Sequence, residues 1–184
     1  PLPIENVDTD QIIPARFLKA TERKGFGDNL FRDWRYNQEN TLIKDFVLND
    51  PTYKGEILVA GKNFGSGSSR EHAAWSIYDY GFRCVISSFF ADIFKNNCLN
   101  IGVLPVKVDQ AFLKDLYEII YENPASEIVV DLPSQMISLE ESNLAASFEI
   151  SSHKKNNLLN GFDDIDYLLN IKNEIKEFSK KTLF

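Results

Sequence analysis

The chain has 184 residues, of which 43% are hydrophobic and 26% are charged, as is typical of a globular domain that can bury a core. No apolar run approaches the roughly 20 residues of a membrane-spanning helix, so we expect no membrane segment. The net charge of −7 lies wholly in residues 109–184, because residues 1–108 carry 13 acidic and 13 basic side chains. Nucleic-acid binding is not expected, since affinity for phosphates needs clustered Lys and Arg.

The cysteine content predicts a reduced protein. Cys84 and Cys98 are the only cysteines in the sequence, and they do not form a CxxC pair. They are too few for a disulfide framework, or for a zinc or iron–sulfur site built by this chain alone. We therefore expect no metal ligands in this chain and a cytoplasmic location. The sequence starts at Pro1 without a basic-then-apolar leader, so we expect no secretory signal and a natural start that is missing or processed.

The elements expected from the sequence pattern alternate between strand and helix. In residues 19–45 the apolar residues recur at neither helix nor strand spacing, which predicts a long ordered loop with short helical pieces. A βαβ pattern then predicts strands at 56–60, 82–88 and 101–108, and helices at 69–80, 89–97 and 109–124. Short alternating segments at 128–132, 136–139 and 145–150 predict an antiparallel meander, followed by helices near 153–159 and 163–180. This order predicts one mixed α/β domain over residues 1–184 with a partly parallel sheet.

The strongest site signal is the octet Gly65-Ser66-Gly67-Ser68-Ser69-Arg70-Glu71-His72, which joins an expected strand to an expected helix. The N–H groups at a helix N-terminus bind anions. Gly65 and Gly67 allow a tight turn, and the planar fork of Arg70 suits a carboxylate. The P-loop and dinucleotide motifs fit poorly, because Ser68 and Arg70 replace their required lysine and third glycine. The octet therefore predicts a carboxylate or phosphate pocket.

A structural interpretation of the octet stays open beside the functional one. Residues 68–71 also match a capping box, in which Ser68 caps the helix and Glu71 reaches back to it. From spacing alone, capping and ligand contact carry equal weight, and both could hold if Ser69 took the cap. A single histidine on the first helical turn, such as His72, is expected to pack or hydrogen-bond rather than to catalyse.

A resemblance covers nearly the whole chain. The matching stretches, in chain order, are 7–14, 25–27, 33–35, 63–73, 79–82, 90–94 and 160–163, and the Gly-Ser-Ser-Arg-Glu-His-Ala run within 63–73 is the most specific. Together they resemble the swivelling domain of the aconitase superfamily, and within it the family of bacterial 3-isopropylmalate dehydratase small subunits. The resemblance implies a swivelling β/β/α three-layer domain. It also implies a hydro-lyase, active only with a large subunit that carries a [4Fe-4S] cluster, which converts 2-isopropylmalate to 3-isopropylmalate in leucine biosynthesis.

The resemblance also implies roles for individual residues. Ser68 matches the base that removes the C–H proton of a small dicarboxylate substrate, and Ser69 and Arg70 match carboxylate binders. Either Arg23 or Lys24 falls where the family places another carboxylate-binding cation, in a substrate loop near 19–36. The supporting positions are Asp10, Glu71, His72, Gly65 and Gly67.

Other functions suit the same octet. Small subunits of citraconate/methylmalate or homoaconitate hydro-lyases need the same carboxylate clamp, and so does a non-enzymatic carboxylate-binding module. The length of the chain and the stretch from Gly25 to Arg35 look more like the isopropylmalate type. We expect the 19–36 loop to decide between substrates, because it is placed to cover the variable end of the acid.

Overall fold

The computed structural model describes residues 1–19, 24–140 and 142–181. The chain divides into two compact units, Pro1–Glu149 and Ile150–Phe184. The expectation of a single domain over residues 1–184 stays a prediction.

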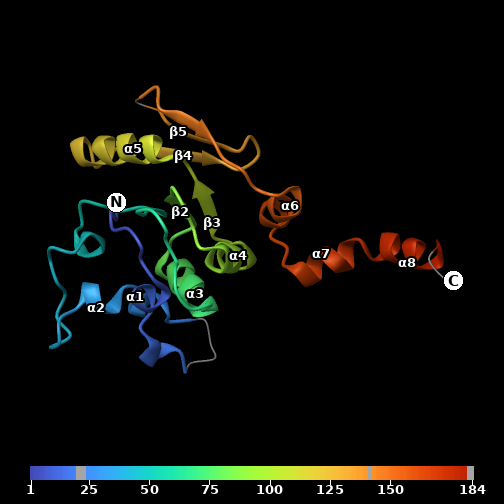
Figure 1. Cartoon of the computed structure of the whole chain (residues 1–184), viewed down its shortest axis with the longest axis horizontal. Helices are drawn as coiled ribbons and strands as arrows, with labels where there is room; N and C mark the ends of the chain where they lie inside the picture. Colours follow the sequence, from blue (N-terminus) through green and yellow to red (C-terminus); the bar gives the residue numbers. More distant parts are fainter. Residues whose placement is uncertain (20–23, 141, 182–184) are drawn as a thin grey trace. The chain divides into compact units, whose positions relative to one another are not determined.

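A parallel sheet forms the centre of the first unit, as the βαβ pattern predicts (Figure 1). Its strands lie in the order β1 (Ile57–Val59), β2 (Cys84–Ser87) and β3 (Leu104–Lys107). Helix α3 (Glu71–Tyr80) joins β1 to β2, and α4 (Asp92–Ile101) joins β2 to β3. All of β2 is buried, which is typical of a parallel strand that is covered on both faces. The predicted mixed α/β class is confirmed.

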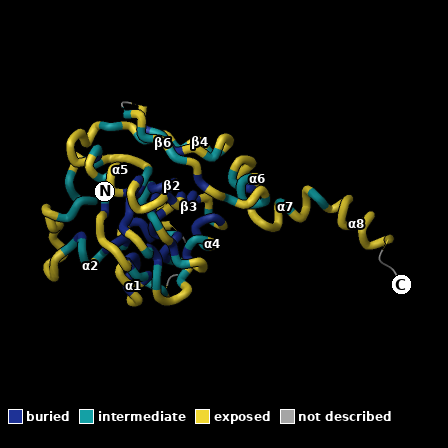
Figure 2. The backbone as a smooth tube through the Cα atoms, turned by 45° about the horizontal axis from the view of Figure 1, so that its top comes forward, coloured by how far each residue is buried: buried dark blue, intermediate teal, exposed yellow. Residues whose placement is uncertain are grey.

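Helices α3 and α4 pack against this sheet through small and apolar side chains. The apolar cluster that they share with the strands includes Ala73, Ala74, Ile77, Phe94, Cys98, Leu58 and Val85. In Figure 2 the buried part of the tube lies where these elements meet. The cluster holds the start of α3 in place, because Ala73 and Ala74, which directly follow the octet, are fully buried.

The predicted antiparallel meander follows the parallel sheet in the chain. Helix α5 (Gln110–Glu122) lies between the two sheets in the sequence. The strands of the meander are β4 (Ile128–Asp131), β5 (Met136–Leu139) and β6 (Ala145–Ser147), paired in the order β4-β5-β6. Asp109 caps α5, since its Oδ1 accepts the Phe112 N–H at 2.6 Å. The hydroxyl of Tyr117 contacts the carbonyl oxygens of Leu2 and Val59, which connects α5 to the edge of the parallel sheet.

The described part of residues 19–45 consists of loop and short helical pieces, as predicted, and similar short pieces lie on either side of it. These are α1 (Thr9–Ile12), η1 (Ala15–Phe17), η2 (Gly27–Asn29), α2 (Arg32–Arg35) and η3 (Val47–Asn49). Asp8 caps α1, because its Oδ1 accepts the Gln11 N–H at 2.8 Å and the Gln11 side chain accepts the Asp8 N–H.

The boundaries of α4 and β3 differ from the prediction. The helix expected over 89–97 begins at Asp92 instead, because Phe90 lies in extended backbone and forms a parallel bridge with Phe64. It also continues to Ile101, which the apolar run had assigned to a strand. Ile101 follows Phe94 and Cys98 at helical spacing and packs against the same core, so it prolongs the buried face of the helix.

The second unit is helical, with α6 (Ser152–Asn160), α7 (Asp164–Asn170) and α8 (Lys172–Lys181). The stretch expected as one helix over 163–180 is two helices that meet at Ile171. Asp164 accepts a hydrogen bond from Lys154 Nζ at 2.8 Å, which lowers the pKa of its carboxyl. Across residues 1–19, 24–140 and 142–181, no helix has both the length and the apolar character needed to cross a membrane.

Candidate functional site

The octet lies in the loop after β1, at the carboxyl end of the parallel sheet, where ligand sites of α/β proteins commonly form. Main-chain bonds hold this loop against the segment that leads into α1. The N–H groups of Gly65 and Ser66 both donate to the Val7 carbonyl, at 2.8 and 3.2 Å, and the Thr9 N–H donates to the Ser66 carbonyl at 2.9 Å. The start of α1 and the loop ahead of α3 therefore lie side by side.

The capping box that the sequence left open at residues 68–71 is not formed. Helix α3 begins at Glu71, and its N-cap residue is Arg70, whose side chain makes no capping bond. Thr9 Oγ1 donates to the Ser68 carbonyl at 3.0 Å, which holds Ser68 outside the helix. Glu71 accepts a hydrogen bond from Trp75 Nε1 at 3.1 Å. The side chain of Ser68 therefore does not cap α3, contrary to the structural interpretation.

The loop presents main-chain donors beside the exposed hydroxyls of Ser68 and Ser69. Within the described ranges, the N–H groups of residues 67–70 make no hydrogen bond. They precede a ten-residue helix, whose dipole places partial positive charge at this end. Unpaired amides ahead of a helix are the arrangement that binds phosphate and carboxylate groups.

Asp10 and Arg70, which are 60 residues apart in sequence, form an ion pair between Asp10 Oδ1 and Arg70 Nη1. The Arg70 side chain is only 18% exposed, whereas that of Asp10 is 54% exposed. Asp10 occupies one nitrogen of the guanidinium, and the other two nitrogens have no partner among the residues that the structure describes. The pair fixes the direction of Arg70 and leaves part of its fork able to take a second carboxylate.

Gly65 and Gly67 are both in the left-handed region, with φ of +77° and +89°. A Cβ on Gly65 would lie 2.1 Å from the ring of Phe94 in α4, so a side chain does not fit there. A Cβ on Gly67 would meet nothing closer than 3.4 Å, so only the backbone conformation calls for glycine. Gly65 thus lets the octet lie directly on α4, and Gly67 turns the chain toward Ser68.

His72 packs against aromatic rings, in agreement with the structural interpretation of this residue. Its ring centroid lies 4.5 Å from that of Trp75 and 5.4 Å from that of Phe26. Phe26 belongs to the expected substrate loop, so this contact connects the loop to α3. Of the two candidate cations in that loop, Lys24 is exposed and Arg23 lies outside the described residues.

Arg35 is a buried arginine that sequence reasoning did not single out. It is 8% exposed, its Nη1 donates to the carbonyls of Gly27 and Leu30 at 3.3 Å, and its guanidinium lies 4.7 Å from the ring centroid of Tyr80. Arg35 therefore stabilises the loop through hydrogen bonds on its buried side. The Asp33-Trp34-Arg35 stretch marks this position in the sequence but does not indicate its role.

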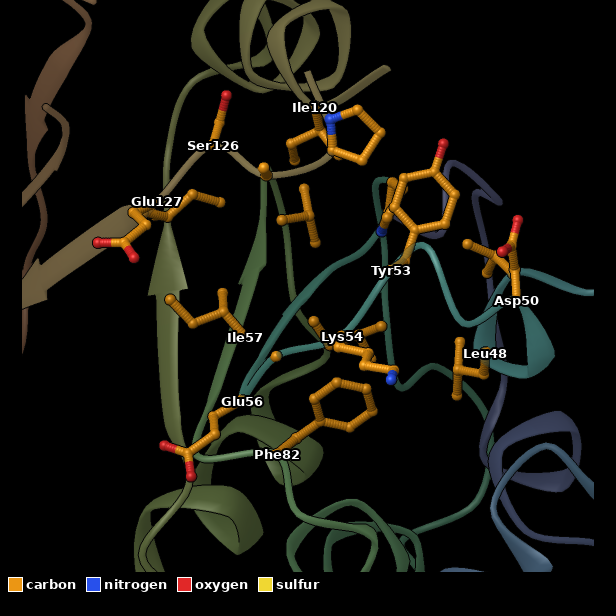
Figure 3. A pocket seen from close by; sticks show the side chains of 18 of the residues that line it. Leu48, Asp50, Tyr53, Lys54, Glu56, Ile57, Phe82, Ile120, Ser126 and Glu127 are labelled. Atoms are coloured by element: carbon orange, nitrogen blue, oxygen red, sulfur yellow. The ribbon is translucent and has the colours of Figure 1, made fainter. Parts of the chain in front are cut away.

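A hollow of about 840 Å³ lies away from the octet, beside β1 and the segment that leads into β4. Figure 3 shows Ile57, Phe82 and Ile120 around it, with the charged side chains of Lys54 and Glu56 nearby. None of residues 65–72 lines this hollow. The candidate site and this hollow are therefore separate features of the unit.

The two cysteines do not fit an iron–sulfur cluster. Both thiols are buried, and burial raises the pKa of Cys84 to about 12 and also raises the pKa of Cys98. Cluster ligands are thiolates, which such surroundings disfavour. Among the described residues, no three His, Cys, Asp or Glu side chains come together as a metal site.

Comparisons with known proteins agree with this fold. Residues 1–111 match the family described as the aconitase C-terminal domain, so the parallel sheet and the octet lie in a domain of that class. Over all 184 residues the chain is 60% identical to a 3-isopropylmalate dehydratase small subunit from Cytophaga hutchinsonii, of which it covers 92%. It is 58% identical over 181 residues to the protein of the same name from Azobacteroides pseudotrichonymphae, covering 98% of this chain and 92% of that protein. The chain belongs to the family of 3-isopropylmalate dehydratase small subunits.

A solved structure supports the same assignment. The crystal structure of 3-isopropylmalate dehydratase from Methanocaldococcus jannaschii superposes with a TM-score of 0.64 at 26% identity, and covers 96% of this chain and 93% of that one. The expected swivelling aconitase-type α/β fold is confirmed by this likeness together with the family match.

Proposed function

We propose that this chain is the small subunit of a 3-isopropylmalate dehydratase and interconverts 2-isopropylmalate and 3-isopropylmalate with a large subunit. The observation that carries the proposal is the loop ahead of α3, where the N–H groups of residues 67–70 lack partners next to Arg70. The names of the relatives support the choice of reaction.

The proposal gives each side chain of the loop a task. Ser68 Oγ takes the proton from the substrate carbon next to a carboxylate. Ser69 and the two nitrogens of Arg70 that Asp10 leaves unused hold the substrate carboxylates. Lys24, or Arg23, binds a carboxylate from the substrate loop.

A serine base needs help from several groups at once. An ordinary hydroxyl ionises only far above neutral pH, so forming its anion near pH 7 costs roughly 12 kcal/mol, at about 1.36 kcal/mol per pKa unit. A helix N-terminus contributes up to about 2 kcal/mol, and one preorganised donor contributes about 2.7–4 kcal/mol. Ser68 is exposed in this chain, so water weakens each of these effects. The base is therefore expected to work only when a partner covers the loop.

The large subunit is the partner in this proposal. The resemblance places the [4Fe-4S] cluster there, and the cluster supplies a Lewis acid when bound. Removal of the C–H proton, by contrast, rests on residues of this chain. The cytoplasmic location is part of the same proposal and is supported by the free thiols of Cys84 and Cys98.

Reconstitution tests the proposal. The chain is mixed with a cluster-loaded large subunit, and the absorbance of the unsaturated acid is followed in parallel as this acid forms from 2-isopropylmalate and as it is consumed from citraconate or homoaconitate. Turnover is expected only when both subunits are present, and it should be fastest with 2-isopropylmalate.

The other outcomes point elsewhere. Turnover by this chain alone would refute the proposal that it needs a large subunit. Faster turnover of citraconate or homoaconitate would reassign the substrate, and carboxylate binding without any turnover would indicate a non-enzymatic module.

A further inference from the structure

We infer that Asp79 is a positioning residue for substrate binding: its carboxylate fixes the base of the substrate loop and so sets where the cation at position 24 stands. The inference rests on the proposed function, because it assigns Asp79 a part in binding the substrate of that site.

The geometry connects Asp79 to the loop twice. Asp79 Oδ2 accepts the N–H of Gly25 at 2.9 Å and the N–H of Gly27 at 2.8 Å. A single carboxylate oxygen thus holds two main-chain groups that are 54 and 52 residues away in the sequence. Hydrogen bonds to a charged acceptor are about twice as strong as neutral ones, so this contact is a firm anchor.

The place of Asp79 in α3 indicates a purpose outside the helix. It lies in the last turn, since α3 ends at Tyr80. The dipole puts partial negative charge at this end, which disfavours a carboxylate. The two donors from Gly25 and Gly27 compensate for this, so the position of the acid is explained by the loop that it binds.

The loop is shaped to reach this anchor. Gly25 has a φ of +88°, and a Cβ on Gly27 would lie 2.5 Å from the main-chain N of Tyr80, so only glycine lets the loop approach α3 so closely. Between them Phe26 is 3% exposed and packs against the rings of His72 and Trp75. Three successive residues therefore hold the loop along the helix.

Helix α3 thereby connects two parts of the proposed site. Ser69 and Arg70 lie just before its first turn, and its last turn holds Gly25, the neighbour of the exposed Lys24. A dicarboxylate held at two points needs those points at a fixed separation. Asp79 sets that separation through the loop and touches no substrate itself.

The test compares Asp79→Ala with Asp115→Ala in the reconstituted enzyme. Asp115 is a suitable control, since it is an exposed carboxylate on a helix of the same unit and no hydrogen bond or ion pair to it is seen among the described residues. We expect Asp79→Ala to raise KM about tenfold, because the substrate is bound less tightly in the ground state and the transition state alike. The kcat should change less than about twofold, because no group that acts on the reacting atoms is removed. Asp79→Asn keeps a neutral acceptor, so its KM should rise only about threefold.

A second measurement separates positioning from general stability. Hydrogen exchange at the Gly25 and Gly27 amides should speed up about tenfold or more in Asp79→Ala, while the thermal midpoint stays close to that of Asp115→Ala. If Asp79→Ala does not fold, the KM of Asp79→Asn tests the inference instead. A wild-type KM in that variant would overturn the inference.

The remaining outcomes are also decisive. If the wild-type complex is active and the KM of Asp79→Ala equals that of Asp115→Ala, the inference is overturned and the proposed function is unaffected. A fall in kcat at unchanged KM would likewise overturn positioning. A wild-type complex that does not turn over would overturn the proposed function and this inference together.

Discussion

Replacing Ser68 by alanine is expected to lower kcat of the reconstituted enzyme by about 10²–10⁴-fold, the range typical for loss of a general base. The exposed hydroxyl of Ser68 caps no helix, and the Ser68 carbonyl accepts from Thr9 whichever side chain is present. The substitution should therefore leave the fold and the association of the subunits intact. The rate of formation of the unsaturated intermediate at saturating substrate measures the effect.

A matched variant controls for loss of a hydroxyl. Ser134→Ala removes the same group from an exposed turn of the same unit, where it bonds to the Asp131 side chain. We expect its turnover to stay near wild type. Turnover of Ser68→Ala at the level of Ser134→Ala would remove Ser68 from the chemistry.

Replacing Gly65 by alanine is expected to destabilise the fold by about 2–5 kcal/mol. The new Cβ would overlap the Phe94 ring, a form of overpacking that typically costs about 1–3 kcal/mol, and the left-handed backbone adds about 1–2 kcal/mol. The free energy of unfolding in urea measures the loss.

Gly67→Ala is the matched comparison. It has a similar positive φ but no contact closer than 3.4 Å, so we expect it to lose only the backbone share of about 1–2 kcal/mol. Equal losses in the two variants would show that the approach of the octet to α4 is not close enough to exclude a side chain.

The sequence predicts the order of strands and helices well. A short apolar run favours a buried strand, and apolar residues at helical spacing favour an amphipathic helix. The parallel sheet and the meander follow from this order. The start of α3 is not predictable in the same way, since Ser68 and Glu71 read equally well as a capping box and as an anion loop. The bond from Thr9 to the Ser68 carbonyl decides between them, and it joins residues 59 apart in the sequence.

Contacts across long stretches of sequence explain what else was missed. The pairing of Asp10 with Arg70, the burial of Arg35 and the anchoring of the loop by Asp79 all depend on how distant segments meet. Resemblance marked Asp10 and Arg70 but gave no role to the other two. Phe89 and Phe90 read as the start of a helix, and only the bridge to Phe64 reveals extended backbone there.

A crystal structure of the assembled enzyme with a non-reactive isopropylmalate analogue tests the central claim most directly. The account predicts a carboxylate within hydrogen-bonding distance of Arg70 and of main-chain N–H groups of residues 67–70, with the carbon to be deprotonated next to Ser68 Oγ. An analogue bound elsewhere, with residues 67–70 and Arg70 facing only solvent or the partner, would contradict it.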